Sequence, residues 1–171
     1  MMERCYILFG SNMGDKDAIF AHACLLINNR CGRVVQVSAA YESEPWGFEA
    51  EDWFLNRVIV VESIKGPEEL LQQLLDIERE LGRIRYPEIN GYTSRTADLD
   101  ILYYGHRVVD TDTLSVPHPR LHLRRFALVP MCEVAPELVH PVFGMTQQEL
   151  LQQCPDESIV REMKTRNEET I

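Results

Sequence analysis

The sequence predicts an α+β protein with a ferredoxin-like βαββαβ core, in which helices pack on an antiparallel sheet, followed by a C-terminal extension. Two features support this prediction. Short runs rich in Val, Ile and aromatic residues alternate with two long helical patterns, and their order along the chain is β-α-β-β-α-β. Since no internal repeat or low-complexity linker interrupts this order, we expect one domain over residues 1–154 and a polar tail over 155–171.

The first half of the chain contains three expected strands and one expected helix. Residues 5–9 are apolar and predict a buried strand, and residues 15–29 predict a helix. Residues 34–41 and 54–62 are rich in β-branched side chains and predict the second and third strands. The segment between these two strands, residues 42–52, carries a proline and a glycine and is expected to be a loop.

The second half opens with the clearest helix signal. Pro67 and two acids suit a first turn, leucines recur at helical spacing as far as Leu81, and Gly82 is the expected stop. A long loop over 83–96 then leads to a strand over 98–104.

Shorter elements are expected after that strand. A helix is predicted near residues 124–133, and the capping box that begins at Thr146 predicts a last short helix. The polar segment from Pro155 onward is expected to pack weakly.

Composition restricts the classes of function. A net charge of −10 argues against a nonspecific nucleic-acid binder, and no run of about 18 apolar residues could span a membrane. The N-terminus lacks the pattern of a signal peptide, and five cysteines without CxxC spacing favour free thiols in a reducing compartment. We therefore expect a cytoplasmic protein that acts on small molecules, and no feature demands more than a monomer.

Two carboxylates on one expected strand are the most informative local feature. Alternate residues of a strand share a face, so Asp98 and Asp100 point one way and Leu99 and Ile101 the other. The two carboxylates are then about 7 Å apart along the strand, where Mg²⁺ could bridge them to phosphate oxygens. The alternative is a solvated strand face with Arg95 as a simple ion-pair partner.

Cationic side chains favour the first interpretation. Arginine forks suit phosphate oxygens, and carboxylates for magnesium beside arginines for phosphate are typical of phosphoryl transfer. The cations near this strand in the sequence are Arg83, Arg85, Arg95, His118, Arg120 and Arg124.

Several separate motifs occur in a fixed order along the chain, and two of them, Arg95-Thr96-x-Asp98-Leu99-Asp100-Ile101 and Val116-Pro117-His118-Pro119-Arg120, are highly specific together. The others are Gly10-Ser11-Asn12, residues 41–47, Phe54-Leu55-Asn56, Ile77-Glu78, Gly82-Arg83-Ile84-Arg85, Arg124-x-Phe126 and Glu133-Val134-Ala135-Pro136. The set resembles the 6-hydroxymethyl-7,8-dihydropterin pyrophosphokinase (HPPK) family over roughly residues 6–150.

The resemblance implies an activity and a cofactor. Pyrophosphate would move from ATP, the co-substrate, to the hydroxymethyl oxygen of a dihydropterin in folate biosynthesis, and AMP would be released. Two Mg²⁺ ions are expected on Asp98 and Asp100, so the protein needs accurate positioning more than a strong base.

The resemblance also implies site residues. A flat pterin favours an aromatic face on each side, which Phe54 and Phe126 would supply, and Asn56 offers both a donor and an acceptor. The implied pterin residues are Ser43, Glu44, Trp46, Phe54, Asn56 and Phe126. The implied ATP residues are Glu78, Arg85, Arg95, Ile101, His118, Arg120 and Arg124, and the implied catalytic residues are Arg83, Arg95, Asp98 and Asp100.

The chain departs from the family pattern at two places. Residues 87–94 lack the usual tryptophan, so Tyr92 is a candidate aromatic cover and this loop a candidate lid that closes on ATP. Glu44 stands where proline is common. Gly10-Ser11-Asn12 lacks the spacing of a phosphate-binding P-loop and is expected to be a structural turn that supports the pterin pocket.

Two rival functions remain open at this point. A nucleotidyltransferase with a ferredoxin-like palm also carries paired aspartates, although the Gly-Ser pair lies far upstream of Asp98 here. A ferredoxin-like ligand-binding module would not need the aspartate pair.

Overall fold

The computed structural model describes residues 2–12, 14–44, 53–83 and 97–163 of the chain. The main sheet has the strand order β5-β1-β4-β3-β8, β2 pairs with β4 as well, and every pairing is antiparallel. Its strands are β1 (Glu3–Ser11), β2 (Arg33–Val37), β3 (Tyr41–Ser43), β4 (Phe54–Ser63), β5 (Asp98–Tyr104) and β8 (Val160–Glu162). Two short strands, β6 (Val109–Asp110) and β7 (Ser115–Val116), pair separately.

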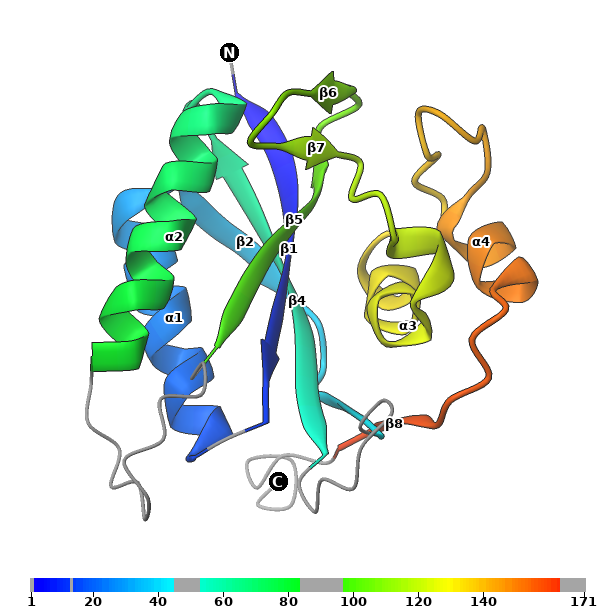
Figure 1. Cartoon of the computed structure of the whole chain (residues 1–171), viewed down its shortest axis with the longest axis horizontal. Coiled ribbons are helices and arrows are strands. Elements are labelled where there is room, and N and C mark those ends of the chain that lie inside the picture. The colour runs from blue at the N-terminus through cyan, green and yellow to red at the C-terminus, as the bar shows by residue number, and fades with distance from the viewer. Residues whose placement is uncertain (1, 13, 45–52, 84–96, 164–171) are drawn as a thin grey trace.

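Helices cover both faces of the sheet and give the molecule three layers (Figure 1). Helices α1 (Lys16–Arg30) and α2 (Pro67–Arg83) lie side by side on one face. On the other face lie a 3₁₀ turn, η1 (Leu121–Leu123), and helices α3 (Arg125–Val134) and α4 (Gln147–Gln153). The ferredoxin-like prediction is confirmed, and the C-terminal extension supplies the third layer. Within the described residues, each helix is too short or too polar to cross a bilayer.

Local sequence signals set most helix ends. The side chain of Asp15 accepts a hydrogen bond from the Ala18 amide at the start of α1, and Thr146 forms the expected capping box with Glu149 at the start of α4. The stop predicted at Gly82 is one residue early, since α2 continues to Arg83. A single glycine lowers helix propensity without forbidding the helix.

The strand predicted over residues 34–41 is instead two strands, β2 and β3, and both pair with β4. A serine causes the break. The Ser38 amide donates to the Val58 carbonyl, and the Val58 amide donates to the Ser38 hydroxyl, so a side chain replaces one backbone acceptor of the ladder. The guanidinium of Arg57 donates to the Ser38 carbonyl at 2.8 and 3.0 Å and completes the kink.

The sheet separates two apolar clusters because neighbouring residues of a strand point to opposite faces. On β1, Ile7 and Phe9 are fully buried in the cluster beneath α1 and α2. Tyr6 and Leu8 belong to the cluster beneath α3 and α4.

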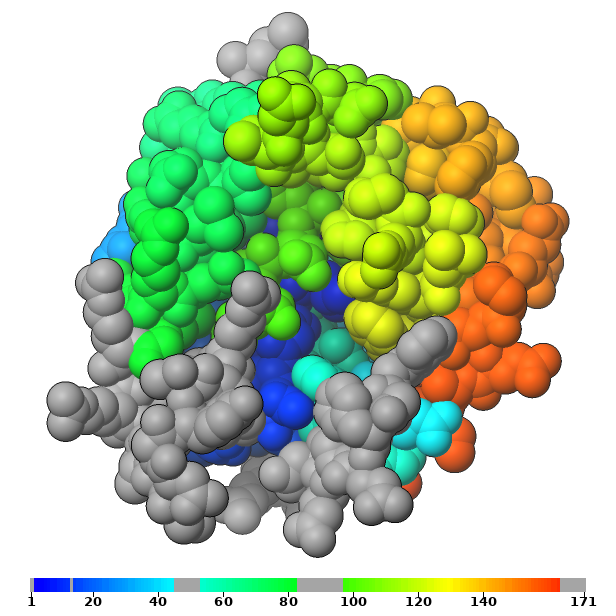
Figure 2. All heavy atoms as spheres, in the orientation of Figure 1, coloured from blue at the N-terminus to red at the C-terminus, as the bar shows by residue number. Residues whose placement is uncertain are grey.

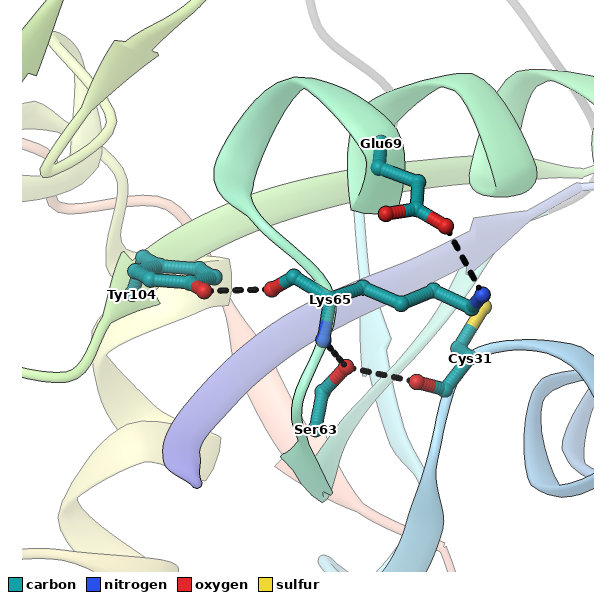
Figure 3. Close-up of polar contacts among 5 residues, drawn as sticks. All are labelled: Cys31, Ser63, Lys65, Glu69 and Tyr104. Atoms are coloured by element: carbon teal, nitrogen blue, oxygen red, sulfur yellow. Dashed lines mark hydrogen bonds and ion pairs between the residues drawn. The ribbon is translucent and has the colours of Figure 1, made fainter. Parts of the chain in front are cut away.

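Hydrogen bonds fix the end of the sheet where β4 leads into α2 (Figure 3). The Ser63 hydroxyl donates to the Cys31 carbonyl at 2.6 Å and accepts from the Lys65 amide, while the Tyr104 hydroxyl donates to the Lys65 carbonyl. The Lys65 ammonium pairs with Glu69 at 3.0 Å. This network ties α1, β4, α2 and β5 together and leaves the opposite end of the sheet for a site.

The C-terminal segment packs more closely than its polarity predicted. Strand β8 pairs with β3, Asp156 is buried, and Met163 packs against the core. The division between a domain ending at residue 154 and a tail stays a prediction.

Candidate active site

One face of the sheet changes from apolar to polar along its length. On β4, Val60 and Val58 lie in the core beneath α3, and Asn56 and Phe54 follow at the same alternation and line a cavity. On β5, Leu102 lies in that core and Asp100 and Asp98 line the cavity in the same way. The floor of the site is therefore the polar continuation of a core-facing surface.

The cavity has a volume of about 550 Å³, which is in the range that holds a small-molecule substrate. Figure 2 shows the hollow, with blue β1 and green β5 at its floor and the yellow segment of η1 and α3 at one side. Its lining residues are Leu8, Gly10, Ser43, Glu44, Phe54, Asn56, Asp98, Asp100, Arg120, Leu123, Arg124 and Phe126.

Nine of the residues that the sequence singled out line this one cavity, although they come from four separate parts of the fold. They are Ser43 and Glu44 from β3 and its end, Phe54 and Asn56 from β4, Asp98 and Asp100 from β5, and Arg120, Arg124 and Phe126 around η1 and the start of α3. The sequence assigned these residues to separate pterin, ATP and magnesium sites, and the fold places them around one cavity.

Three lining residues were not predicted as ligands. Leu8 and Gly10 lie on the central strand β1, and the period-two alternation of that strand could have indicated both. Leu123 belongs to the three-residue turn η1, for which the sequence offers no periodic signal.

Gly10 joins the two halves of the floor. It pairs with Asn56 on β4 and with Asp98 on β5, and a Cβ added to it would lie 3.5 Å from the Asn56 Oδ1. The prediction of a turn at residues 10–12 needs correction, because Gly10 and Ser11 are the last residues of β1. β1 pairs with β5 as far as Gly10 and with β4 as far as Ser11, and this pairing keeps both residues extended.

A buried hydrogen bond holds the floor at β3 and β4. Asn56 Nδ2 donates to Ser43 Oγ at 2.8 Å, and both residues are almost fully buried. The bond fixes the plane of the Asn56 amide. Phe54 and Phe126 are half-buried, as expected for aromatic rings that line a cavity rather than fill a core.

His118 lies next to the arginine side of the cavity and is held as a neutral hydrogen-bond donor. Its burial, together with Arg124 and Arg120, lowers its pKa from 6.5 to about 4. Its Nδ1 accepts a hydrogen bond from the Arg120 amide at 3.1 Å, so the proton of the neutral ring is on Nε2. The His118 amide donates to the Leu102 carbonyl on β5.

Two predicted ATP residues are linked to β5 away from the cavity. Ile101 is buried in the core beneath α1 and α2. The Glu78 carboxylate on α2 accepts a hydrogen bond from the Leu99 amide at 2.7 Å, between the two aspartates of β5. Glu78 thereby supports the strand that carries Asp98 and Asp100, and a direct role of either residue in ATP binding stays a prediction.

Five further predictions concern residues or side chains that the structure does not describe. Trp46, Arg85 and Arg95 are outside the described residues, as is the candidate lid at residues 87–94 with Tyr92. Arg83 is the last residue of α2, and its side chain is not described.

The donor set of the cavity fits Mg²⁺ as the metal. Among the described residues no group of three or more His, Cys, Asp and Glu side chains could form an all-protein metal cage. Asp98 and Asp100 supply two carboxylates in a cavity that also holds Arg120 and Arg124. Magnesium is usually bound by one or two carboxylates together with substrate phosphates and water, and this pair matches that pattern.

Carboxylates, arginines and aromatic side chains around one cavity are typical of the class of enzymes that transfer phosphoryl groups to a substrate with a flat ring. Comparison with known proteins gives the family. The sequence model described as 7,8-dihydro-6-hydroxymethylpterin-pyrophosphokinase (HPPK) matches residues 6–136, and the chain belongs to this family. Its members transfer a pyrophosphoryl group from ATP to hydroxymethyldihydropterin in folate synthesis.

Relatives from several organisms support this family assignment. The chain is 39% identical to the 2-amino-4-hydroxy-6-hydroxymethyldihydropteridine pyrophosphokinase of Porphyromonas gingivalis, over 80% of this chain and 92% of that protein. It is 38% identical to the enzyme of the same name from Methylorubrum extorquens, over 94% of this chain and 99% of that protein. It is 34% identical to the folic acid synthesis protein fol1 of Pneumocystis carinii, of which it spans only 21%.

Solved structures support the fold. The Plasmodium falciparum HPPK-DHPS with pteroate aligns with a TM-score of 0.73 at 14% identity, over 90% of this chain and 44% of that one.

Proposed function

We propose that this chain is an Mg²⁺-dependent pterin pyrophosphokinase whose two substrates meet in the cavity on the sheet face beneath η1 and α3. The observation that supports it best is the convergence of nine predicted ligands on one space of about 550 Å³. The proposed ligands include aromatic, amide, carboxylate and guanidinium groups, which are the groups that a pterin and a magnesium triphosphate require together.

The pterin is proposed to lie between Phe54 and Phe126, with its amide-like edge on Asn56. Because Asn56 is already bonded to Ser43, its amide is oriented before the ligand arrives. Preorganisation of this kind lowers the entropy cost of binding. Ser43, Glu44 and Trp46 are the remaining proposed pterin residues.

The triphosphate of ATP is proposed to lie along the cationic side of the cavity. Arg120 and Arg124 line it, and His118 can donate from Nε2 without adding charge. Arg83, Arg85 and Arg95, with Glu78 and Ile101, complete the proposed nucleotide site.

Asp98 and Asp100 would hold the magnesium, and two ions are expected. Bound there, Mg²⁺ would neutralise phosphate charge and align the triphosphate. The Glu78 carboxylate accepts a hydrogen bond from the Leu99 amide, which lies between the two aspartates. This bond fixes the backbone of the strand that carries Asp98 and Asp100.

The proposed reaction joins the pterin hydroxymethyl oxygen to the β-phosphorus of ATP and breaks the bond from that phosphorus to the oxygen bridging it to the α-phosphorus. The bridging oxygen leaves with AMP, and the alcohol proton is lost to water. Since phosphoryl transfer passes through a loose transition state, orientation of the alcohol and stabilisation of charge matter more than a strong base. Arg83 and Arg95 are proposed to stabilise that charge.

The test is an assay with 6-hydroxymethyl-7,8-dihydropterin, ATP and Mg²⁺ that identifies both products. Release of AMP with a pyrophosphorylated pterin is the expected result. Release of pyrophosphate with nucleotide transfer would instead identify a nucleotidyltransferase. Pterin binding without any turnover in the presence of Mg²⁺ would identify a ligand-binding module.

Two further proposals concern the state of the protein in the cell. We propose a monomer that works in the cytoplasm, where ATP is available and the five cysteines stay reduced. Light scattering coupled to size exclusion should give one chain mass, and a dimer mass would contradict the first proposal.

A further inference from the structure

The segment Pro155–Met163, called here the C-terminal strap, lies beyond the family match, which ends at residue 136. It contacts both sides of the pterin end of the cavity. We infer that the strap sets the position of Phe126 relative to β3 and so acts as a positioning element for the pterin. This inference rests on the proposed function.

The first contact is at the start of α3. The N-cap residue Arg124 makes no side-chain cap, and the first turn of α3 contains no acidic residue. Asp156 of the strap replaces the missing cap, because its Oδ2 accepts the Arg125 amide at 3.1 Å. A carboxylate at this end of a helix also interacts favourably with the helix dipole.

Asp156 is itself held firmly. Its Oδ1 accepts the Ser158 amide at 2.9 Å and the Ser158 hydroxyl at 2.6 Å, and the residue is only 8% exposed. Burial alone would raise the Asp156 pKa, but the hydrogen bonds from Ser158 and Arg125 together hold it below its usual value. The carboxylate is therefore ionised and fixed at neutral pH.

The second contact is at the end of β3. The Glu44 amide donates to the Ile159 carbonyl at 3.3 Å, and the Ile159 amide donates to the Glu44 carboxylate at 2.9 Å. Val160 then pairs with Ser43 as part of β8. Ser43 and Glu44 both line the cavity, so the strap is bonded directly to this wall.

A third contact reaches the start of β4. Arg161 pairs with Glu42 at 2.9 Å, and its guanidinium lies 4.3 Å from the ring centre of Trp53, the neighbour of Phe54. Within a few residues the strap thus connects the walls that carry Phe126, Ser43 and Phe54. Loss of the Asp156 link frees the start of α3 while β8 stays paired with β3.

The test compares Asp156→Ala with Glu157→Ala, a neighbouring exposed acid of the same strap. Pterin affinity is measured by titration with 6-hydroxymethylpterin at a temperature where both variants are folded by circular dichroism. We expect Asp156→Ala to weaken pterin binding about fivefold, since a helix cap is worth a factor of this size, and Glu157→Ala to leave it unchanged.

A double-mutant cycle with Phe126→Ala separates positioning from general stability. If the strap acts through Phe126, Asp156→Ala should weaken binding less than about twofold once Phe126 is removed. An equal loss in both backgrounds would overturn the inference, as would unchanged affinity with a lower melting temperature. Asp156→Asn keeps one acceptor oxygen, should give an intermediate loss, and replaces Asp156→Ala in the cycle if that variant does not fold.

The wild-type chain separates the two proposals. If it releases no AMP from 6-hydroxymethyl-7,8-dihydropterin, ATP and Mg²⁺, the proposed function fails and the strap inference fails with it. If it binds the pterin and releases AMP while Asp156→Ala binds equally well, only the strap inference fails.

Discussion

The two faces of the sheet are built from the same strands but are used differently. The face beneath α1 and α2 is mostly apolar, with Arg57 packed on the Phe20 ring of α1, and Phe9, Leu55 and Leu99 continue the core as far as the end of the sheet where the cavity lies. The face beneath α3 is apolar only at one end of the sheet. At the other end, the strand positions that point to this face carry polar residues such as Asn56 and Asp98. The side chains that these strands direct toward α1 and α2 therefore stabilise the fold, whereas some of those on the opposite face line the cavity.

This difference predicts separate consequences for the two faces. A change on the α1/α2 face should lower the free energy of unfolding and leave substrate contacts intact. A change at the polar end of the other face should affect catalysis or binding and cost little stability, because active sites are commonly not optimised for stability.

The largest expected effect is at Asp98 and Asp100, the proposed magnesium ligands. Asp98→Asn should lower kcat about a thousandfold, equivalent to about 4 kcal/mol, because a charge that orients the triphosphate is lost. Its melting temperature should change little, since residues of an active site commonly contribute little to stability. Steady-state kinetics and thermal unfolding measure both. Asp112→Asn, an exposed aspartate outside the cavity, is the control, and activity within about tenfold of wild type would contradict the assignment.

The next effect is on the opposite face. Leu74→Ala removes a fully buried side chain of α2 and should lower the free energy of unfolding by about 3 kcal/mol. The KM values for both substrates should not change at a temperature well below the transition. Urea unfolding and kinetics test this expectation. Leu25→Ala, at a position 59% exposed on α1, should leave stability nearly unchanged. A large change in KM for Leu74→Ala would show that the two faces are coupled.

A smaller effect is expected at the aromatic wall. Phe126→Ala should weaken pterin binding about tenfold, or about 1.4 kcal/mol, through loss of a ring contact. It also removes the ring whose centre lies 5.6 Å from the Arg124 guanidinium. Calorimetric titration with the pterin measures the loss. The matched control is Phe143→Ala, whose ring lies outside the cavity against His140. Equal losses in the two variants would argue against a specific role of Phe126.

The smallest expected effect depends on pH. His118 has a folded pKa of about 4 against an ordinary value of 6.5, so the unfolded state binds more protons between these values. Its contribution to stability is complete above pH 6.5 and is lost as the pH falls through this window toward 4. Because the ring is partly exposed, solvent screening reduces the effect to about 1 kcal/mol.

The measurement is urea unfolding from pH 7.5 to 4.5 for wild type and His118→Gln. The stability advantage of wild type should shrink as the pH falls, whereas exposed His106→Gln should follow wild type throughout. An advantage that is constant with pH would show that His118 is not held neutral.

The sequence predicted the main elements and much of the site because both depend on local signals. The strand over Asp98–Tyr104 was predicted with its observed bounds, and Thr146 caps the last helix as expected. The break at Ser38 was missed because it depends on hydrogen bonds to Val58 and Arg57, which lie about 20 residues away. The pairing of β8 with β3 was missed for the same reason.

By itself, then, the sequence determined that Asp98 and Asp100 share a strand face, since alternation along an extended chain is a property of the backbone. Its ordered motifs determined the family. Only the tertiary structure decided that Ser43, Phe126 and the aspartates meet in one cavity, and that Asp156 caps α3. Such contacts depend on the register of the sheet and on the closure of long loops, which no local pattern encodes.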